Sequence, residues 1–196
     1  NNGTTFIPLF DNEMVMTIGA FDVNWDTDEI WIGTGEVNSS RSSYAGLGMF
    51  YSADKGKNWE HRGLEETHHI GRVIIHPDEP KTVYVASLGK LYSPGGGGLY
   101  KTTDAGKSWE KVFETKTAGV VDAEYVEERG LLFISVWERS RKAWNFIEAG
   151  PETAVWMSPD DGQNWTELSA QTGFPAGNLI GRIGFDITLD QNNQWI

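Results

Sequence analysis

The feature that most constrains the fold is a short pattern that occurs three times along the chain. It reads Ser or Thr, any residue, Asp, any residue, Gly, any two residues, Trp, and its copies are 52-SADKGKNW-59, 102-TTDAGKSW-109 and 158-SPDDGQNW-165. The aspartates are separated by 50 residues (104 − 54) and by 56 residues (160 − 104). A period of this length indicates a solenoid, a propeller or another repeat array.

Short runs rich in β-branched and aromatic residues accompany each copy of the pattern, as is typical of strands. In each repeat we expect three strands before the turn and one that begins at its tryptophan. The expected strands include residues 20–23, 30–32, 49–51, 73–75, 83–85, 99–101, 109–113, 120–123, 132–134 and 155–157. Four short strands in about 50 residues predict one four-stranded antiparallel blade of an all-β β-propeller.

The repeat also divides the chain. Three complete blades are expected, at 15–63, 64–114 and 115–168. Residues 1–14 fit the end of a preceding blade, with Phe6 at the tryptophan position, and residues 169–196 fit the start of a following one, because 185-FDITLDQNNQWI-196 aligns with 21-FDVNWDTDEIWI-32. On this interpretation the chain is an arc of a larger propeller, and the remaining blades of the same protein are its partners.

The fixed positions of the pattern are expected to be structural. Aspartate accepts hydrogen bonds from backbone N–H groups a few residues on, glycine supplies a positive φ, and tryptophan fills the space between blades. Copies spread round a ring cannot converge on one substrate, so we assign no catalysis to these aspartates. The structural residues are Ser52, Asp54, Gly56, Trp59, Thr102, Asp104, Gly106, Trp109, Ser158, Asp160, Gly162 and Trp165.

The pattern resembles the Asp-box, or BNR repeat, of sialidases, sortilin-type (VPS10) propellers and several glycosidase propellers. Segments 33–59, 67–77 and 181–184 also resemble large bacterial secreted proteins described as sortilin N-terminal-like or glycosyl-hydrolase-like BNR proteins. The resemblance implies a β-propeller and an extracytoplasmic location, which is secreted, periplasmic or at the cell surface. It leaves the function open, because this fold carries both enzymes and non-enzymes.

Composition narrows the range of partners. The formal net charge of −12 argues against nucleic acid or an anionic membrane as the main partner. No stretch approaches the ~20 apolar residues of a membrane span. The absence of cysteine excludes a disulfide or a thiolate metal site. We expect no cofactor and no metal, because His68 and His69 would point to opposite sides of a strand and segment 22–28 lacks the glycine of a calcium loop.

Long polar segments fall after the second and fourth strands of the repeats, at the end of the blades opposite the repeated pattern. Loops on a rigid scaffold commonly carry binding residues. These segments are 34–48, 61–69, 88–98, 137–150 and 169–178. The candidate ligand-binding residues are Glu36, Asn38, Arg41, His68, His69, Arg72, Arg139, Arg141, Trp144 and Arg182.

Structural roles compete with binding at several of these positions. Glu36 and Arg41 can pair to order their own loop. Arg72 and Asp122 occupy equivalent places on the first strands of successive blades, where they can form an ion pair. The aromatic and basic side chains of 137–144 can form a stacking platform for a sugar or a peptide, or they can pack between blades.

Three functions fit this sequence, and whether it is an enzyme stays open. The first is a ligand-recognition propeller that binds a peptide, a protein or a glycan on its loops. The second is part of a sialidase- or xyloglucanase-like glycoside hydrolase, for which Glu36 is the best single catalytic candidate, ahead of Asp122 and Glu138. That chemistry needs two carboxylates, about 5–5.5 Å apart for retention or about 6.5–9.5 Å apart for inversion. The third is a structural part of a secreted assembly.

Overall fold

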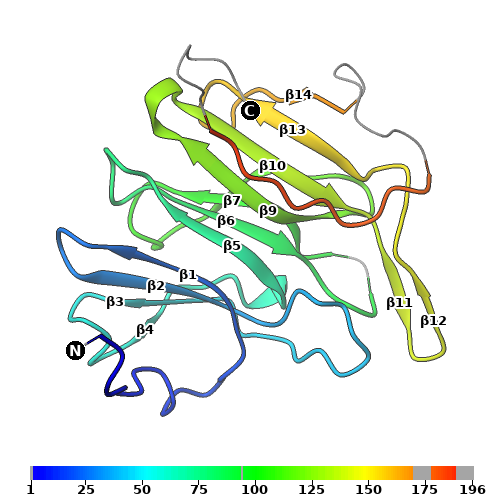
Figure 1. Cartoon of the computed structure of the whole chain (residues 1–196). Coiled ribbons are helices and arrows are strands. Elements are labelled where there is room, and N and C mark those ends of the chain that lie inside the picture. Colours follow the sequence, from blue (N-terminus) through cyan, green and yellow to red (C-terminus); the bar gives the residue numbers. More distant parts are fainter. Residues whose placement is uncertain (1, 94, 170–177, 189–196) are drawn as a thin grey trace.

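A computed structural model describes residues 2–93, 95–169 and 178–188 of the chain. Three four-stranded antiparallel sheets, which we call the first, second and third blades, are stacked in sequence order (Figure 1). Their strands are β1 (Ile18–Asn24), β2 (Glu29–Thr34), β3 (Met49–Ser52) and β4 (Glu60–His61); β5 (Ile70–Ile75), β6 (Val83–Leu88), β7 (Gly97–Thr102) and β8 (Glu110–Phe113); and β9 (Gly119–Val126), β10 (Leu131–Trp137), β13 (Ala154–Ser158) and β14 (Thr166–Glu167). The all-β fold and the four-stranded blades confirm the fold predicted from the repeat.

The connection between β10 and β13 differs from the expected plain loop. It contains a two-stranded hairpin, β11 (Ser140–Lys142) and β12 (Asn145–Ile147). Two short 3-10 helices, η1 (Glu65–Thr67) and η2 (Glu127–Arg129), complete the described elements. Within the described residues, neither helix has the length and apolar character that a membrane crossing requires.

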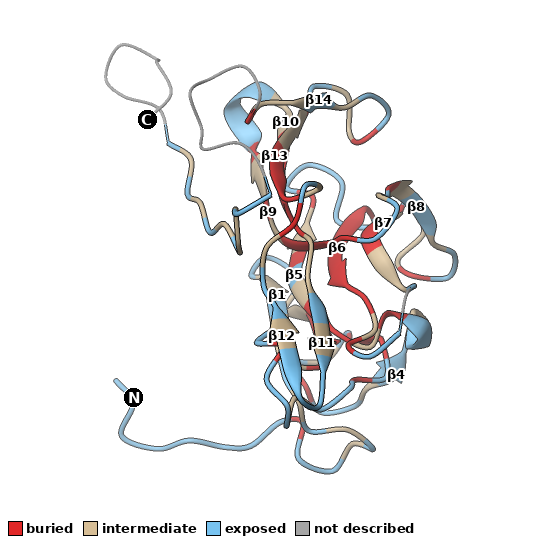
Figure 2. Cartoon of the chain, turned by 90° about the vertical axis from the view of Figure 1, so that its right-hand side faces the viewer, coloured by how far each residue is buried: buried red, intermediate tan, exposed pale blue. Residues whose placement is uncertain are grey.

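The core lies between successive blades. Trp31 and Met49 of the first blade pack against Ile70 and Val83 of the second. A second cluster is built in the same way between the second and third blades, from residues that include Tyr84, Leu99, Val120, Leu132 and Ile134. The middle strands are covered on both sides, which is why they read as continuous apolar runs in the sequence. In Figure 2 the buried residues gather in β6 and β10, and the β11–β12 hairpin is largely exposed.

The repeated turns (52–59, 102–109 and 158–165) are closed by one set of hydrogen bonds. In the first turn, Ser52 Oγ donates to Asp54 Oδ1 (2.9 Å) and accepts from Gly56 N (2.8 Å). Asp54 also accepts from the backbone N (2.9 Å) and the side chain (2.6 Å) of Asn58, and these bonds lower the pKa of Asp54 to about 2. Gly56 has φ +78°, a conformation that favours glycine. The same bonds recur at the corresponding positions of the other two turns.

The tryptophan of each turn reaches across to the preceding segment. Trp109 Nε1 donates to the Arg62 carbonyl (2.7 Å), three residues after Trp59, and Trp165 Nε1 donates to the Val112 carbonyl (3.0 Å), three residues after Trp109. These bonds tie the outer strands of neighbouring blades together.

Trp59 makes the corresponding bond to the residues before the first blade. Its Nε1 donates to the Leu9 carbonyl (2.7 Å), three residues after Phe6. Phe6 itself, which the alignment places at the tryptophan position of the preceding blade, is 87% exposed. The buried ring there belongs to Phe10, which packs edge-on against Phe50 and Trp59.

The described residues before and after the three blades form no strand. Residues 178–188 run beside the third blade (Figure 1), where Ser135 Oγ donates to the Ile183 carbonyl (2.9 Å) and Ile187 N donates to Glu124 Oε2 (3.2 Å). The strand expected from Phe185 is not formed over 185–188. The Ile183 carbonyl and the Ile187 N–H bond to side chains of the third blade and not to a neighbouring strand. The elements expected in 189–196, and the loop expected at 169–178 except for its two end residues, lie outside the described residues.

Candidate functional site

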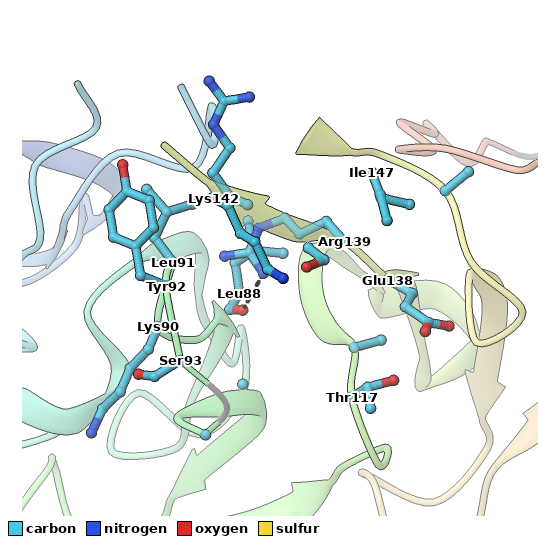
Figure 3. Close-up of a pocket in the computed structure, with 16 residues that line it drawn as sticks. Leu88, Lys90, Leu91, Tyr92, Ser93, Thr117, Glu138, Arg139, Lys142 and Ile147 are labelled. Atoms are coloured by element: carbon cyan, nitrogen blue, oxygen red, sulfur yellow. Dashed lines mark hydrogen bonds between the residues drawn. The ribbon is translucent and has the colours of Figure 1, made fainter. Parts of the chain in front are cut away.

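The long connections between strands gather at one end of the blades, which we call the loop face. The repeated turns lie at the opposite end, because successive strands of each blade are antiparallel (Figure 1). On the loop face, a pocket of about 400 Å³ lies between the second and third blades. It is lined by the β6–β7 connection, by Thr117 and Ala118, and by the β10–β13 connection with its hairpin (Figure 3).

The lining of this pocket is rich in cations. Lys90, Arg139, Arg141 and Lys142 line it, with Glu138 as its carboxylate. Lys90 forms an ion pair with a glutamate outside the pocket, and Glu138 Oε2 accepts a hydrogen bond from the Glu152 backbone N (2.8 Å). The other three cations form no ion pair with any residue in the described part of the chain. The pocket therefore carries a local positive charge in a strongly acidic protein.

Arg139 joins the loops of all three blades. Its Nε donates to Ser39 Oγ (2.6 Å) in the first blade, and its Nη1 and Nη2 donate to the Leu88 and Gly89 carbonyls (3.2 and 3.5 Å) in the second. Burial lowers the pKa of Arg139 to about 10, so it stays protonated at neutral pH. Because these acceptors are neutral, its charge is not compensated.

The two adjacent histidines have different environments. His69 is 2% exposed, and burial, with the positive charges of Arg139 and His68, lowers its pKa to about 4. Its Nδ1 is buried and has no hydrogen-bond partner among the residues that the structure describes. His68 is half-buried, with its ring centre 6.3 Å from that of His69. The described residues contain no group of three or more His, Cys, Asp or Glu side chains arranged to hold a metal.

A second hollow, of about 320 Å³, adjoins the pocket through Arg141. It is also lined by Arg41, Trp144 and Phe146, and the Arg141 guanidinium lies 4.7 Å from the Phe146 ring centre. Trp144, in the β11–β12 turn, is 83% exposed, whereas Trp137 is 4% exposed and donates from Nε1 to the Glu148 carbonyl (2.8 Å). Trp137 therefore packs between blades, whereas Trp144 faces solvent, where a stacking platform would need it.

The expected pairing of Glu36 with Arg41 does not form in the described structure. Loop 34–48 is held instead by backbone and hydroxyl bonds, and the Arg41 carbonyl accepts a hydrogen bond from Tyr92 Oη (2.9 Å) of the neighbouring blade. Glu36 is half-buried, Asn38 is exposed, and neither lines the pocket. The structure thus separates the leading catalytic candidate from the cationic pocket.

Arg72, on β5, and Arg182, in segment 178–188, belong to a different group beside Asp122 of β9. Arg72 Nε lies 3.9 Å from Asp122 Oδ1, as the ion-pair interpretation expects. Burial raises the pKa of Asp122, and the charges of Arg72 and Arg182 oppose that shift. None of these three residues lines the pocket.

Sequence comparison assigns the chain to a family. The family model for Sortilin-Vps10, described as "Sortilin, neurotensin receptor 3", matches residues 48–175, which are 128 of the 196 residues. The chain belongs to the Sortilin-Vps10 family. The matched region spans the second and third blades and therefore contains the whole pocket. No curated protein matches the sequence.

Solved structures that resemble this Sortilin-Vps10 chain include GH74 enzymes. An ancestral GH74 enzyme is 16% identical with a TM-score of 0.58, and the match covers 79% of this chain and 20% of that one. The Niastella koreensis GH74 enzyme is 15% identical with a TM-score of 0.51, and the match covers 72% of this chain and 19% of that one. The Xanthomonas campestris GH74 xyloglucanase is 17% identical with a TM-score of 0.57, and the match covers 85% of this chain and 25% of that one. These identities show the shared propeller fold alone, and the chain spans a quarter or less of each of these proteins.

Some residues of the Sortilin-Vps10 loop face were not among the sequence candidates. Tyr92 and Lys142 line the pocket, and Ser39 holds Arg139. Glu152 accepts bonds from the Thr117 backbone N (2.8 Å) and Oγ1 (2.7 Å) and orders the β8–β9 connection. A basic and aromatic cluster in the hairpin sequence was the available signal for Lys142. No local pattern marks the other three.

Proposed function

We propose that this Sortilin-Vps10 chain is a ligand-recognition segment of a propeller, and that it binds a peptide, a protein or a glycan on its loop face. The observation that carries the proposal is the pocket of about 400 Å³ between the second and third blades, which combines cations that form no ion pair among the described residues with the exposed ring of Tyr92. Pockets that mix apolar surface with a few convergent polar groups are the usual form of ligand sites.

The exposed rings strengthen the case for binding. Tyr92, which lines the pocket, is 58% exposed, and Trp144, which lines the adjoining hollow that shares Arg141, is 83% exposed. Both side chains offer a flat apolar face with a polar edge, which suits stacking on a sugar or a peptide. Tyr92 is also fixed by its bond to the Arg41 carbonyl, so little side-chain entropy is lost on binding.

The hydrolase alternative has less support from the pocket. Ordinary glycoside hydrolysis needs two carboxylates. In the described residues Glu138 is the carboxylate that lines the pocket, and it already accepts a hydrogen bond from the Glu152 backbone. The likeness to GH74 enzymes carries no catalytic residue over to this chain, because the identities are 15–17%.

We also propose an extracytoplasmic location and further propeller blades as partners. The first blade leaves an apolar hollow of about 520 Å³, bordered by the exposed rings of Phe21 (66%) and Trp25 (83%). A blade buries such a surface against a neighbouring blade. The net charge of −12 disfavours nucleic acid as a ligand.

Array binding combined with a hydrolysis screen tests this function. The 196-residue chain should bind at least one glycan, peptide or protein probe, and Trp144→Ala or Tyr92→Ala should weaken that binding about 10-fold or more. Lys57→Ala, on the opposite end of the blades, is the matched control and should bind as the parent does. Turnover of a glycan that Glu36→Gln abolishes would instead support the hydrolase.

A further inference from the structure

We infer that the pocket between the second and third blades is a subsite for an anionic sugar, a saccharide unit that carries a carboxylate or a sulfate. Arg139 and Lys142 would face the anionic group, and Tyr92 and Ile147 would flank the sugar ring. The inference rests on the proposed ligand-recognition function and names the ligand class of that same site.

The first argument is the charge of the pocket centre. Figure 3 shows Arg139 and Lys142 at its centre, with Tyr92 and Leu91 on one side and Ile147 and Glu138 on the other. Neither cation has a carboxylate partner among the described residues. Two like charges in one pocket repel each other, and a bound anion removes this repulsion. The pocket therefore favours an anion over a neutral ligand.

The second argument is the state of the Arg139 guanidinium. A guanidinium has five N–H donors, and three of those of Arg139 are bonded, to Ser39, Leu88 and Gly89. These bonds fix the plane of the group from two blades, so two donors remain with a set orientation. A positively charged guanidinium of fixed orientation that still has N–H donors to offer suits a carboxylate or a sulfate.

The third argument favours a sugar over an extended peptide. Peptides that bind by strand addition need a long open edge, but β11, the hairpin strand that lines the pocket, has three residues. Within the β6–β7 connection, Lys90 N donates to the Gly95 carbonyl (2.9 Å) and Gly89 N donates to Ser87 Oγ (3.1 Å). Beside its cations, the pocket offers the Tyr92 ring and the aliphatic side chains of Leu91 and Ile147, and such apolar surfaces stack on the faces of sugars.

Calorimetry with ligands of one length tests the inference on the 196-residue chain. The two anionic probes are a galacturonate hexamer and a sulfated hexamer of otherwise neutral sugars. The two comparison probes are neutral cellohexaose and a hexaglutamate peptide. At least one of the two anionic hexamers should bind 10-fold or more tighter than cellohexaose and hexaglutamate, and raising the salt concentration should weaken that binding. Comparing the galacturonate hexamer with the sulfated one identifies which anion the pocket takes.

Matched charge reversals place the binding in the pocket. Lys142→Glu should weaken binding of the anionic hexamer at least 10-fold, whereas Lys57→Glu, which changes the net charge equally at the turn end, should change it less than 2-fold. Arg139→Gln should give a similar loss of binding, and circular dichroism would show whether that variant is folded. If it is unfolded, the result for Lys142→Glu decides whether the pocket binds the anion.

Each remaining outcome overturns the inference. Equal losses in Lys142→Glu and Lys57→Glu would mean that only the total charge matters. Equal or tighter binding of cellohexaose or hexaglutamate would exclude the anionic-sugar class, but it would leave the proposed loop-face function intact if Trp144→Ala or Tyr92→Ala still weakened that binding. No binding of any probe that depends on Tyr92, Trp144 or Lys142 would contradict both proposals.

Discussion

At the turn end of the blades, three copies of one hydrogen-bond set close three hairpins, and each tryptophan is bonded to the segment before it. At the loop end, each connection has its own length and its own contacts. The turns bond their serine or threonine, aspartate and backbone groups to one another. The loops leave cations and aromatic rings exposed around a pocket. The difference indicates that one end of the fold secures stability and the other is free to bind.

Removing an aromatic ring at each end is the strongest test of whether the turn end contributes more to stability than the loop end. Trp109 packs against Trp31 and donates to the Arg62 carbonyl. Trp109→Ala should therefore lower the free energy of unfolding by about 3 kcal/mol. Trp144→Ala, the same change at an 83% exposed site, should alter it by less than about 0.5 kcal/mol. Denaturant unfolding of the two variants checks this; similar losses would refute the division of roles.

A smaller change tests the hydroxyl of one repeated turn. Thr102 is 2% exposed, and its Oγ1 accepts hydrogen bonds from Gly106 N (2.9 Å) and Asp104 N (3.2 Å). Thr102→Val keeps the shape but leaves these N–H groups unsatisfied, at a cost of about 1–3 kcal/mol. The exposed neighbour Thr103 provides the control, because Thr103→Val should be nearly neutral. Melting temperatures of the two variants that differ by less than 1 °C would contradict this role.

The loop end should show a smaller, pH-dependent contribution from Glu152. Burial raises the pKa of this carboxyl, but bonds from the side chain and backbone of Thr117 and from Thr115 and Ala118 outweigh burial and lower it to about 2. A carboxyl whose pKa is depressed in the folded state adds stability at pH values above its ordinary pKa of 4.5. That stability is lost as the pH falls toward 2. After allowance for solvent screening we expect about 1 kcal/mol.

Glu152→Gln isolates this contribution. The variant should be less stable than the parent at pH 7, and the two should converge as the pH falls from about 4.5 to about 2. Unfolding curves recorded across that range supply the measurement. A constant difference at every pH would mean that the glutamate acts through packing and not through its charge.

The blades could be predicted from the sequence because their cause is local and repeated. Strand runs and turn residues recur at a fixed spacing, so each copy supports the others. The hairpin of 140–147 was not predicted, because it occurs once, in the third blade. Arg139 was a sequence candidate, but its partner Ser39 lies 100 residues away, and no local pattern links the two. The sequence also placed Glu36 among the binding residues, although the fold keeps it out of the pocket.

Hydrogen exchange on the 196-residue chain, with and without a ligand found on the arrays, tests the central claim most directly. The account predicts that the ligand slows exchange in 88–93 and 138–147 and leaves the repeated turns at 52–59 and 102–109 unchanged. Protection confined to those turns, with none in the loops around the pocket, would contradict it.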